Sequence, residues 1–90
     1  MDIDRARKYI DSVRWQFAKT MPKNPHEYTV REWNKDKESE FVWFVEAIRE
    51  FGVQERFYKA TYIYFVIDGL KYWTMGSPIE KTIIINRAKI

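Results

Sequence analysis

The chain has 90 residues, which is enough for one hydrophobic core, so we expect a single domain over residues 1–90. It is 46% hydrophobic and 18% aromatic, which excludes an intrinsically disordered chain, and the absence of cysteine excludes disulfides, thiolate metal sites and a cysteine nucleophile. The net charge of +3 permits nucleotide or nucleic-acid binding without requiring it.

The first 15 residues, "MDIDRARKYIDSVRW", are charged and lack the apolar segment of a signal peptide. No apolar run approaches the roughly 20 residues of a membrane span. Small secreted domains are commonly rich in disulfides, and this chain has no cysteine. The sequence therefore predicts a cytoplasmic protein that does not enter a membrane.

The first predicted element is a helix over residues 3–19, with Asp2 as its N-cap. Apolar residues recur along it at steps of three and four and form one stripe: Ile3, Ala6, Ile10, Val13 and Phe17. Trp15 lies off this stripe, so it packs on a second surface, is exposed, or lines a site.

Residues 20–35 follow, and Pro22 and Pro25 interrupt the helical pattern. The "EYTV" string favours a short edge strand. A second helix is predicted over residues 37–51, capped by Asn34 or Asp36 and ended by Gly52 in the left-handed conformation.

Asp68-Gly69 separates two β-branched and aromatic runs, a pattern typical of a hairpin with a two-residue type I′ turn. The implied register places two sets of pairs on opposite faces. One face pairs Ile67 with Leu70, Phe65 with Tyr72 and Ile63 with Thr74. The other pairs Val66 with Lys71, Tyr64 with Trp73 and Tyr62 with Met75.

A turn is predicted at residues 76–78, and "KTIIINR" then reads as a strand that pairs with the run from Leu70 to Met75. We expect an α+β fold, with two helices packed on one face of a small, mainly antiparallel sheet of three or four strands. The predicted core contains Ile10, Val13, Phe17, Phe44, Ile48, Ile63, Phe65, Ile67 and Ile84.

Three groups of residues could form a site. Tyr62, Tyr64 and Trp73 share one face of the hairpin and could stack a flat ligand, with Lys71 supplying charge; the same face could instead be covered by protein. The "PHEYTVR" string joins an acid–base group to a carboxylate, a phenol and a guanidinium, although its members could equally be solvated. The "WTMG" string could allow a ligand to approach Gly76 closely, or could simply end a strand.

Several classes of site lose their usual support. A single histidine cannot build the usual multi-histidine zinc site, so no metal is predicted. There is no glycine-rich phosphate loop, nucleophile elbow or HExxH string, and no cofactor is predicted.

The strings "WQFAKTMPKNPHEYTVREW" and "YIYFVIDGLKYWTMGSPIEKTIIINR" resemble a family of small, uncharacterised bacterial and phage proteins. The resemblance spans residues 15–87 and rests on the Pro-His-Glu-Tyr-Thr and Tyr-Trp-Thr-Met-Gly strings. It implies that the two strings meet at one site, and it carries no established activity.

The leading hypothesis is a non-catalytic binding module for a nucleotide or nucleobase, extending to nucleic acid. Its predicted ligand-binding residues are Trp15, His26, Tyr28, Arg31, Tyr64, Trp73, Asn86 and Arg87. The aromatic rings would stack, Arg31 or Arg87 would hold phosphate, and Asn86 would read a polar edge.

Two alternatives stay open. The chain could be a small enzyme acting on a nucleotide or phosphodiester, with His26 as the acid or base, Glu27 or Tyr28 assisting, and Arg31 stabilising negative charge. It could also be a homodimer, or another interaction protein, formed through the aromatic face.

Overall fold

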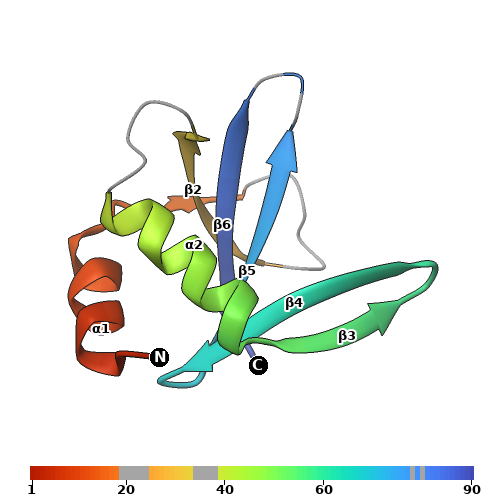
Figure 1. Ribbon diagram of the computed structural model, residues 1–90, viewed down its shortest axis with the longest axis horizontal. Coiled ribbons are helices and arrows are strands. Elements are labelled where there is room, and N and C mark those ends of the chain that lie inside the picture. Colours follow the sequence, from red (N-terminus) through yellow and green to blue (C-terminus); the bar gives the residue numbers. More distant parts are fainter. Residues whose placement is uncertain (19–24, 34–38, 78, 80) are drawn as a thin grey trace.

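The computed structural model describes residues 1–18, 25–33, 39–77, 79 and 81–90. Within these residues the chain forms two α-helices and six strands: α1 (Ile3–Ser12), β1 (Gln16–Phe17), β2 (Glu27–Glu32), α2 (Glu40–Phe51), β3 (Val53–Phe57), β4 (Ala60–Ile67), β5 (Leu70–Ser77) and β6 (Thr82–Lys89). The sheet is antiparallel, with the strand order β1-β2-β6-β5-β4-β3 (Figure 1). The predicted α+β class is confirmed, but three or four strands was too few because β1 and β3 were not anticipated.

Helix α1 is shorter than predicted. Asp2 caps it as expected, since its carboxylate accepts a hydrogen bond from the Arg5 backbone N–H at 3.1 Å. The helix ends at Ser12, whose hydroxyl donates to the Tyr9 carbonyl at 2.7 Å and so competes for a backbone acceptor. The chain beyond it is extended, and Phe17 lies on β1 with 60% of its surface exposed, so the core assignment of Phe17 was wrong.

Helix α2 begins after Ser39, whose hydroxyl oxygen accepts a hydrogen bond from the Val42 N–H at 3.2 Å. Ser39 therefore takes the capping role predicted for Asn34 or Asp36, which lie outside the described residues. Gly52 follows the helix with φ −73° and ψ 162°, so the predicted left-handed conformation is wrong. Glycine is needed there for space, because an added Cβ would lie 2.4 Å from the Ile48 carbonyl oxygen and from Ile63 Cγ2.

The central hairpin forms as predicted. Asp68 and Gly69 have φ values of 51° and 78°, and positive φ at both positions defines a type I′ turn. The ladder pairs Ile67 with Leu70 and continues as far as Tyr64 with Trp73. The pairs predicted beyond that point, Ile63 with Thr74 and Tyr62 with Met75, are not part of it. There β4 leaves β5 and continues with β3 as a projecting hairpin (Figure 1).

Two further strand predictions changed. The "EYTV" strand is β2, and it is internal, because β1 covers the edge that would otherwise be open. The "KTIIINR" strand is β6, which pairs with β5 as expected and also with β2. The predicted turn at Gly76 and Ser77 is wrong, since β5 continues through both residues to meet β6, and Pro78 lies outside the described residues.

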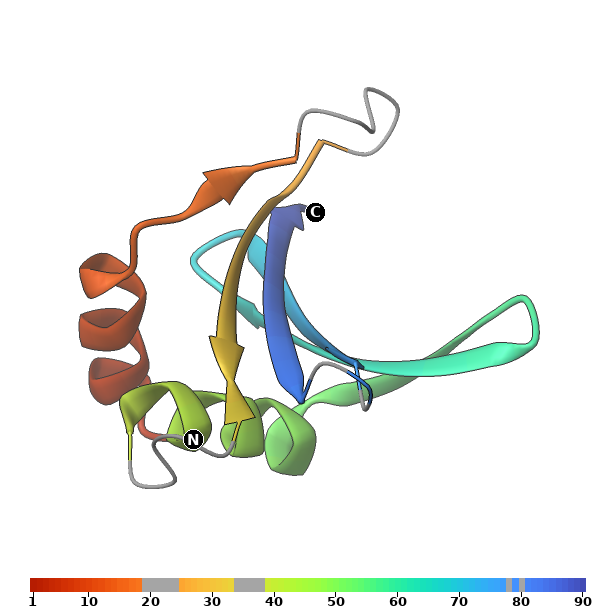
Figure 2. The same cartoon turned by 90° about the horizontal axis from the view of Figure 1, so that it is seen from above.

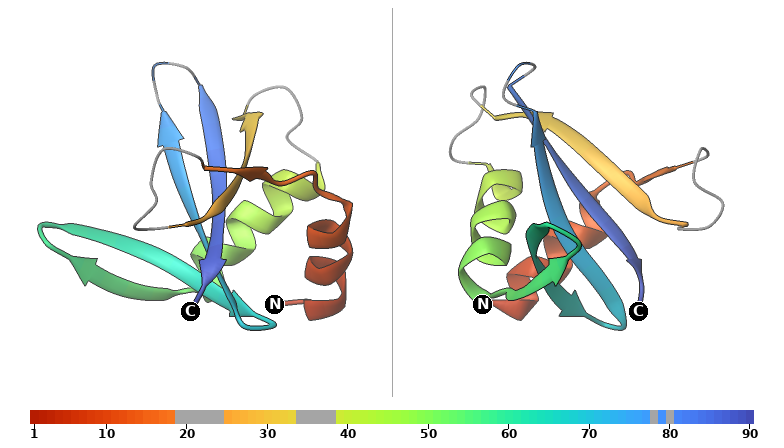
Figure 3. Two further views of the ribbon diagram at one scale, coloured as in Figure 1. Left: turned by 180° about the vertical axis from the view of Figure 1, so that it is seen from behind. Right: turned by 90° about the vertical axis from the view of Figure 1, so that its right-hand side faces the viewer.

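Both helices lie on the same side of the twisted sheet (Figures 2 and 3). Helix α2 crosses β4 and β5, and α1 packs against α2. The core between these layers consists of Ala6, Tyr9, Ile10, Phe41, Val42, Phe44, Val45, Ile48, Ile67, Tyr72, Ile83 and Ile85. Aromatic packing runs through it: the Phe44 ring centroid lies 5.2 Å from that of Tyr9 and 5.6 Å from that of Tyr72.

Of the predicted core, Ile10, Phe44, Ile48 and Ile67 are buried, and Val13, Ile63 and Phe65 are partly buried against it. The prediction of Ile84 was wrong. Side chains alternate along β6, and Ile83 and Ile85 face the helices, so Ile84 faces the other way.

Candidate ligand-binding face

One face of the sheet receives neither helix, and we call it the helix-free face. Its side chains alternate with those that enter the core, so the pairing of the strands identifies them. They include Tyr28 and Val30 on β2, Ile84, Asn86 and Ala88 on β6, Lys71, Trp73 and Met75 on β5, and Tyr62, Tyr64 and Val66 on β4. The face is rich in aromatic and apolar groups and carries few charges.

A single row of paired residues crosses the middle of this face. Tyr28 pairs with Asn86, Asn86 with Trp73, and Trp73 with Tyr64. We call these four residues the central row. Adjacent strands lie about 4.8 Å apart, so the backbones of Tyr28 and Trp73 are separated by about 10 Å with Asn86 between them. The two strings singled out in the sequence, Pro-His-Glu-Tyr-Thr and Tyr-Trp-Thr-Met-Gly, are thus joined through β6.

Asn86 is the unusual member of the central row. Only 3% of its surface is exposed, and its buried Nδ2 group has no hydrogen-bond partner in the part of the chain that the structure describes. Buried amide groups are nearly always paired, because an unpaired buried donor loses its hydrogen bonds to water without replacement. The neighbours of Asn86 on the same face of β6 are Ile84 and Ala88, which offer no side-chain acceptor.

His26 lies beside the central row, next to Trp73. It immediately precedes β2, and its ring centroid lies 6.0 Å from that of Trp73 at an angle of 49°. Glu27 does not accompany it, because the Glu27 carboxylate accepts hydrogen bonds from Arg87 at 3.2 and 3.4 Å on the opposite side of the sheet. The Glu27 carboxylate is thus engaged on the helix side of the sheet, whereas Tyr28, the other residue predicted to assist His26, lies on the same face as Trp73.

A cation lies beside the Tyr64 end of the central row. The Lys71 ammonium is 4.7 Å from the ring centroid of Tyr62 and 4.6 Å from that of Tyr64, and it donates a hydrogen bond to the Tyr62 hydroxyl at 2.6 Å. The Tyr62 hydroxyl in turn donates to Glu55 at 3.1 Å. This chain of contacts orders the two tyrosine rings beside Trp73.

The remaining predicted residues lie on the helix side. The Arg87 guanidinium sits 4.3 Å from the ring centroid of Trp15 and is bound by Glu27. Trp15 meets Tyr72 edge to face at 6.0 Å, and its Nε1–H donates to the Ile10 carbonyl at 3.2 Å. Burial raises the pKa of the Tyr72 hydroxyl, while the hydrogen bond and charge of Arg87 oppose the rise.

Arg31 also points toward the helices, because it alternates with Val30 on β2. Burial raises the pKa of Tyr9 to about 12, and the positive charge of Arg31 opposes that rise. The structure therefore brings His26, Tyr28, Tyr64, Trp73 and Asn86 together and separates them from Trp15, Arg31 and Arg87.

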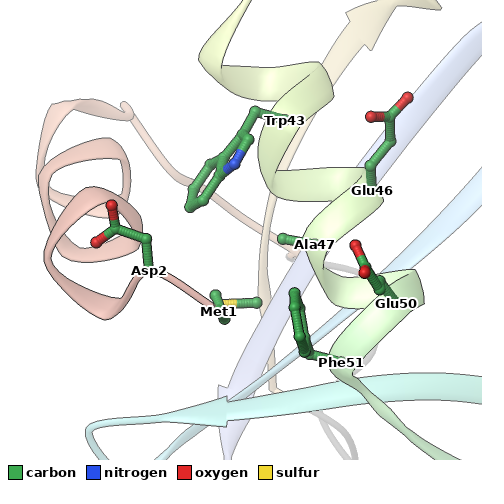
Figure 4. Close-up of a pocket in the computed structure, with 7 residues that line it drawn as sticks. All are labelled: Met1, Asp2, Trp43, Glu46, Ala47, Glu50 and Phe51. Carbon is green, nitrogen blue, oxygen red and sulfur yellow. The ribbon is translucent and has the colours of Figure 1, made fainter.

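The structure has a second surface that the sequence patterns did not reveal. It is a pocket between the N-terminal residues and α2 (Figure 4). It is lined by Met1, Asp2, Trp43, Glu46, Ala47, Glu50 and Phe51. Trp43 on this surface also carries the Arg5 guanidinium at 4.2 Å from its ring centroid. Trp43 thus serves a different surface from Trp73, and the acidic lining of the pocket is unsuited to a phosphate.

The helix-free face can stack a flat ring and offer it one amide donor. Among the described residues, no cluster of histidine, aspartate and glutamate side chains is placed to hold a metal ion. Neither helix within the described part of the chain is long and apolar enough to cross a membrane. Comparison of the sequence and structure with protein-family models, curated proteins and solved structures found no match.

Proposed function

We propose that the chain is a non-catalytic binding module that holds a nucleobase on its helix-free face. The observation that carries this proposal is the central row, in which a buried amide, whose Nδ2 group has no hydrogen-bond partner among the described residues, stands between aromatic residues on neighbouring strands. Aromatic side chains stack on bases of any sequence, and amide groups read their polar edges. The base could belong to a nucleoside, a nucleotide or a single-stranded nucleic acid.

The phosphate group of a bound nucleotide would contribute less to the binding affinity than the sequence predicted. Arg31 and Arg87 face the helices, and Arg87 is already bound by Glu27 and stacked on Trp15. Lys71 is a cation beside the central row, and its ammonium group already contacts the rings of Tyr62 and Tyr64. We therefore expect nucleosides and their monophosphates to bind with similar affinity.

Calorimetric titration of the protein tests the proposal, with nucleosides, nucleotides and short single-stranded oligonucleotides as ligands. Loss of one stacked aromatic ring costs about 1–3 kcal/mol, so Trp73→Leu should weaken binding by roughly 5- to 150-fold. Trp43→Leu is the matched control, since Trp43 is also partly buried but lies on α2. Absence of binding by every compound at millimolar concentration would refute the proposal.

A second candidate function follows from the apolar residues around the central row. Val30, Val66 and Met75 are exposed by 41%, 43% and 57%, and all three lie on the helix-free face. A contiguous apolar patch commonly marks a protein interface, so we propose self-association through this face as the alternative. Sedimentation measurements over a range of concentrations test it: Met75→Lys should reduce any dimer, whereas a wild-type monomer at high concentration excludes it.

A further inference from the structure

We infer that Asn86 determines the specificity of the helix-free face by donating a hydrogen bond from Nδ2 to an acceptor on the edge of the bound ring. This inference rests on the proposed function, and it names the feature that the ligand must carry. The ligand is a heteroaromatic ring with an edge acceptor, as in a nucleobase, and not a hydrocarbon ring such as a phenylalanine side chain.

The position of Asn86 argues against a structural role for its Nδ2 group. Within the described residues its Nδ2 group bonds to nothing, so the group does not join β6 to a neighbouring strand or loop. A leucine would fill the same space between Ile84 and Ala88 without leaving a donor unpaired. An unpaired buried donor lowers the stability of the free protein. A ligand that supplies the missing acceptor accounts for the presence of such a donor.

The surroundings of Asn86 restrict what that partner can be. Tyr28 and Trp73 flank it on the adjacent strands, and the His26 ring lies near Trp73. An incoming group must therefore lie against aromatic surfaces and present its acceptor at one edge. A flat ring with a ring nitrogen or carbonyl at its edge meets both requirements, and asparagine pairs in this way with the N7 and N6 atoms of adenine.

The free protein holds this donor in a closed site. Because Asn86 is 3% exposed, a ring can reach Nδ2 only after a neighbouring side chain moves. Trp73 and His26 are only half-buried, so rotation of either side chain opens a path without breaking the strand ladder. Binding should consequently change the fluorescence of Trp73.

Two matched ligand pairs test the inference by calorimetry: adenosine with 7-deazaadenosine, and cytidine with 3-deazacytidine. Each second member lacks one ring acceptor and keeps the stacking surface. In the wild-type protein we expect removal of the contacted acceptor to weaken binding by about tenfold for at least one pair. In Asn86→Leu both members of that pair should bind equally, at the weaker level, and the melting temperature should rise.

Thr29→Val is the matched control, because Thr29 is the other buried polar residue among those described, and it faces the helices. It should leave the ratio of affinities within each pair unchanged. If the ring compounds bind but the two members of each pair bind equally well, the inference about Asn86 is overturned and the proposed function stands. A fall in the melting temperature of Asn86→Leu would also overturn it, because it would assign the amide a structural role. If no ring compound binds, both the inference and the proposed function are refuted.

Discussion

Gly52 joins α2 to β3, and its substitution by alanine provides a quantitative test of the packing between helix and sheet. The backbone at Gly52 has φ −73° and ψ 162°, which alanine adopts without strain. The added methyl group, however, would lie 2.4 Å from the Ile48 carbonyl oxygen and 2.8 Å from the Tyr64 carbonyl oxygen. Both atoms belong to the backbone and cannot rotate away.

The size of the effect follows from these distances. Ordinary van der Waals contact begins at 3.4 Å, so the methyl group would have to lie about 1 Å farther from the Ile48 carbonyl oxygen of α2 and about 0.6 Å farther from the Tyr64 carbonyl oxygen of β4. Overpacking of this kind costs about 1–3 kcal/mol and occasionally more. Because two backbone segments must move, we expect a loss of about 3 kcal/mol for Gly52→Ala. In a domain of this size, that corresponds to a melting temperature lower by roughly 12–24 °C.

Thermal and urea unfolding of three glycine variants separates the causes. Gly69→Ala has nothing within 4 Å but must hold φ at 78°, so it should lose only about 1–2 kcal/mol through backbone strain. Gly76→Ala has its nearest atom at 4.0 Å, and it should be neutral or stabilising by up to about 1 kcal/mol. The reasoning fails if Gly52→Ala unfolds at the same temperature as the wild-type protein, or if Gly69→Ala is the more damaging change.

Substitutions at three further positions test other parts of the structure. Ser39→Ala should destabilise the protein by about 1 kcal/mol in urea unfolding through loss of the α2 cap, whereas Ser39→Asp should retain stability. The pKa of Tyr9 is about 12 in the folded protein against 10 in the unfolded chain, so stability should fall as the pH rises from 10 to 12. The fall should be smaller in Tyr9→Phe, and equal slopes in the two proteins would contradict the assignment. The hydrogen bond from Arg7 lowers the pKa of Asp68 below 3.8, so the stability from this pair is present above that pH and is lost as the pH falls through the folded-state pKa. Asp68→Asn preserves a residue suited to the turn, and melting curves between pH 2 and 5 should show less acid dependence in that variant.

The central hairpin was predictable because its information is local. Asp68-Gly69 fixes the turn, the turn fixes the register, and the register places Tyr64 opposite Trp73. The alternation of side chains then separates the core face from the aromatic face. The choice of partner for β6 followed from the same patterning.

Other features depended on contacts that no local pattern contains. The apolar stripe of α1 continues through Val13 and Phe17, yet the chain leaves the helix at Ser12, because an extended segment pairs with β2 and lets Trp15 cover Tyr72. Gly52 resembled a left-handed helix end, whereas its neighbours Ile63 and Tyr64 arrive from β4 and demand a small residue. The strand β3 carries polar and charged side chains, and its pairing with β4 defines it.

The predicted site residues lie on two different faces of the sheet, and the strand register explains this division. Glu27, Arg87 and Tyr72 precede or follow Tyr28, Asn86 and Trp73 by one position on the same three strands, so the two sets alternate between the two faces. On the helix side, Arg87 is held by Glu27 and stacks on Trp15, which fixes β2 and β6 relative to one another. Tyr72, which is 1% exposed, fixes β5 against the core. Arg87, which was expected to hold phosphate, instead supports the backbone of the central row from the helix side of the sheet. An arrangement of this kind keeps the backbone spacing of Tyr28, Asn86 and Trp73 constant when a neighbouring side chain moves to admit a ligand.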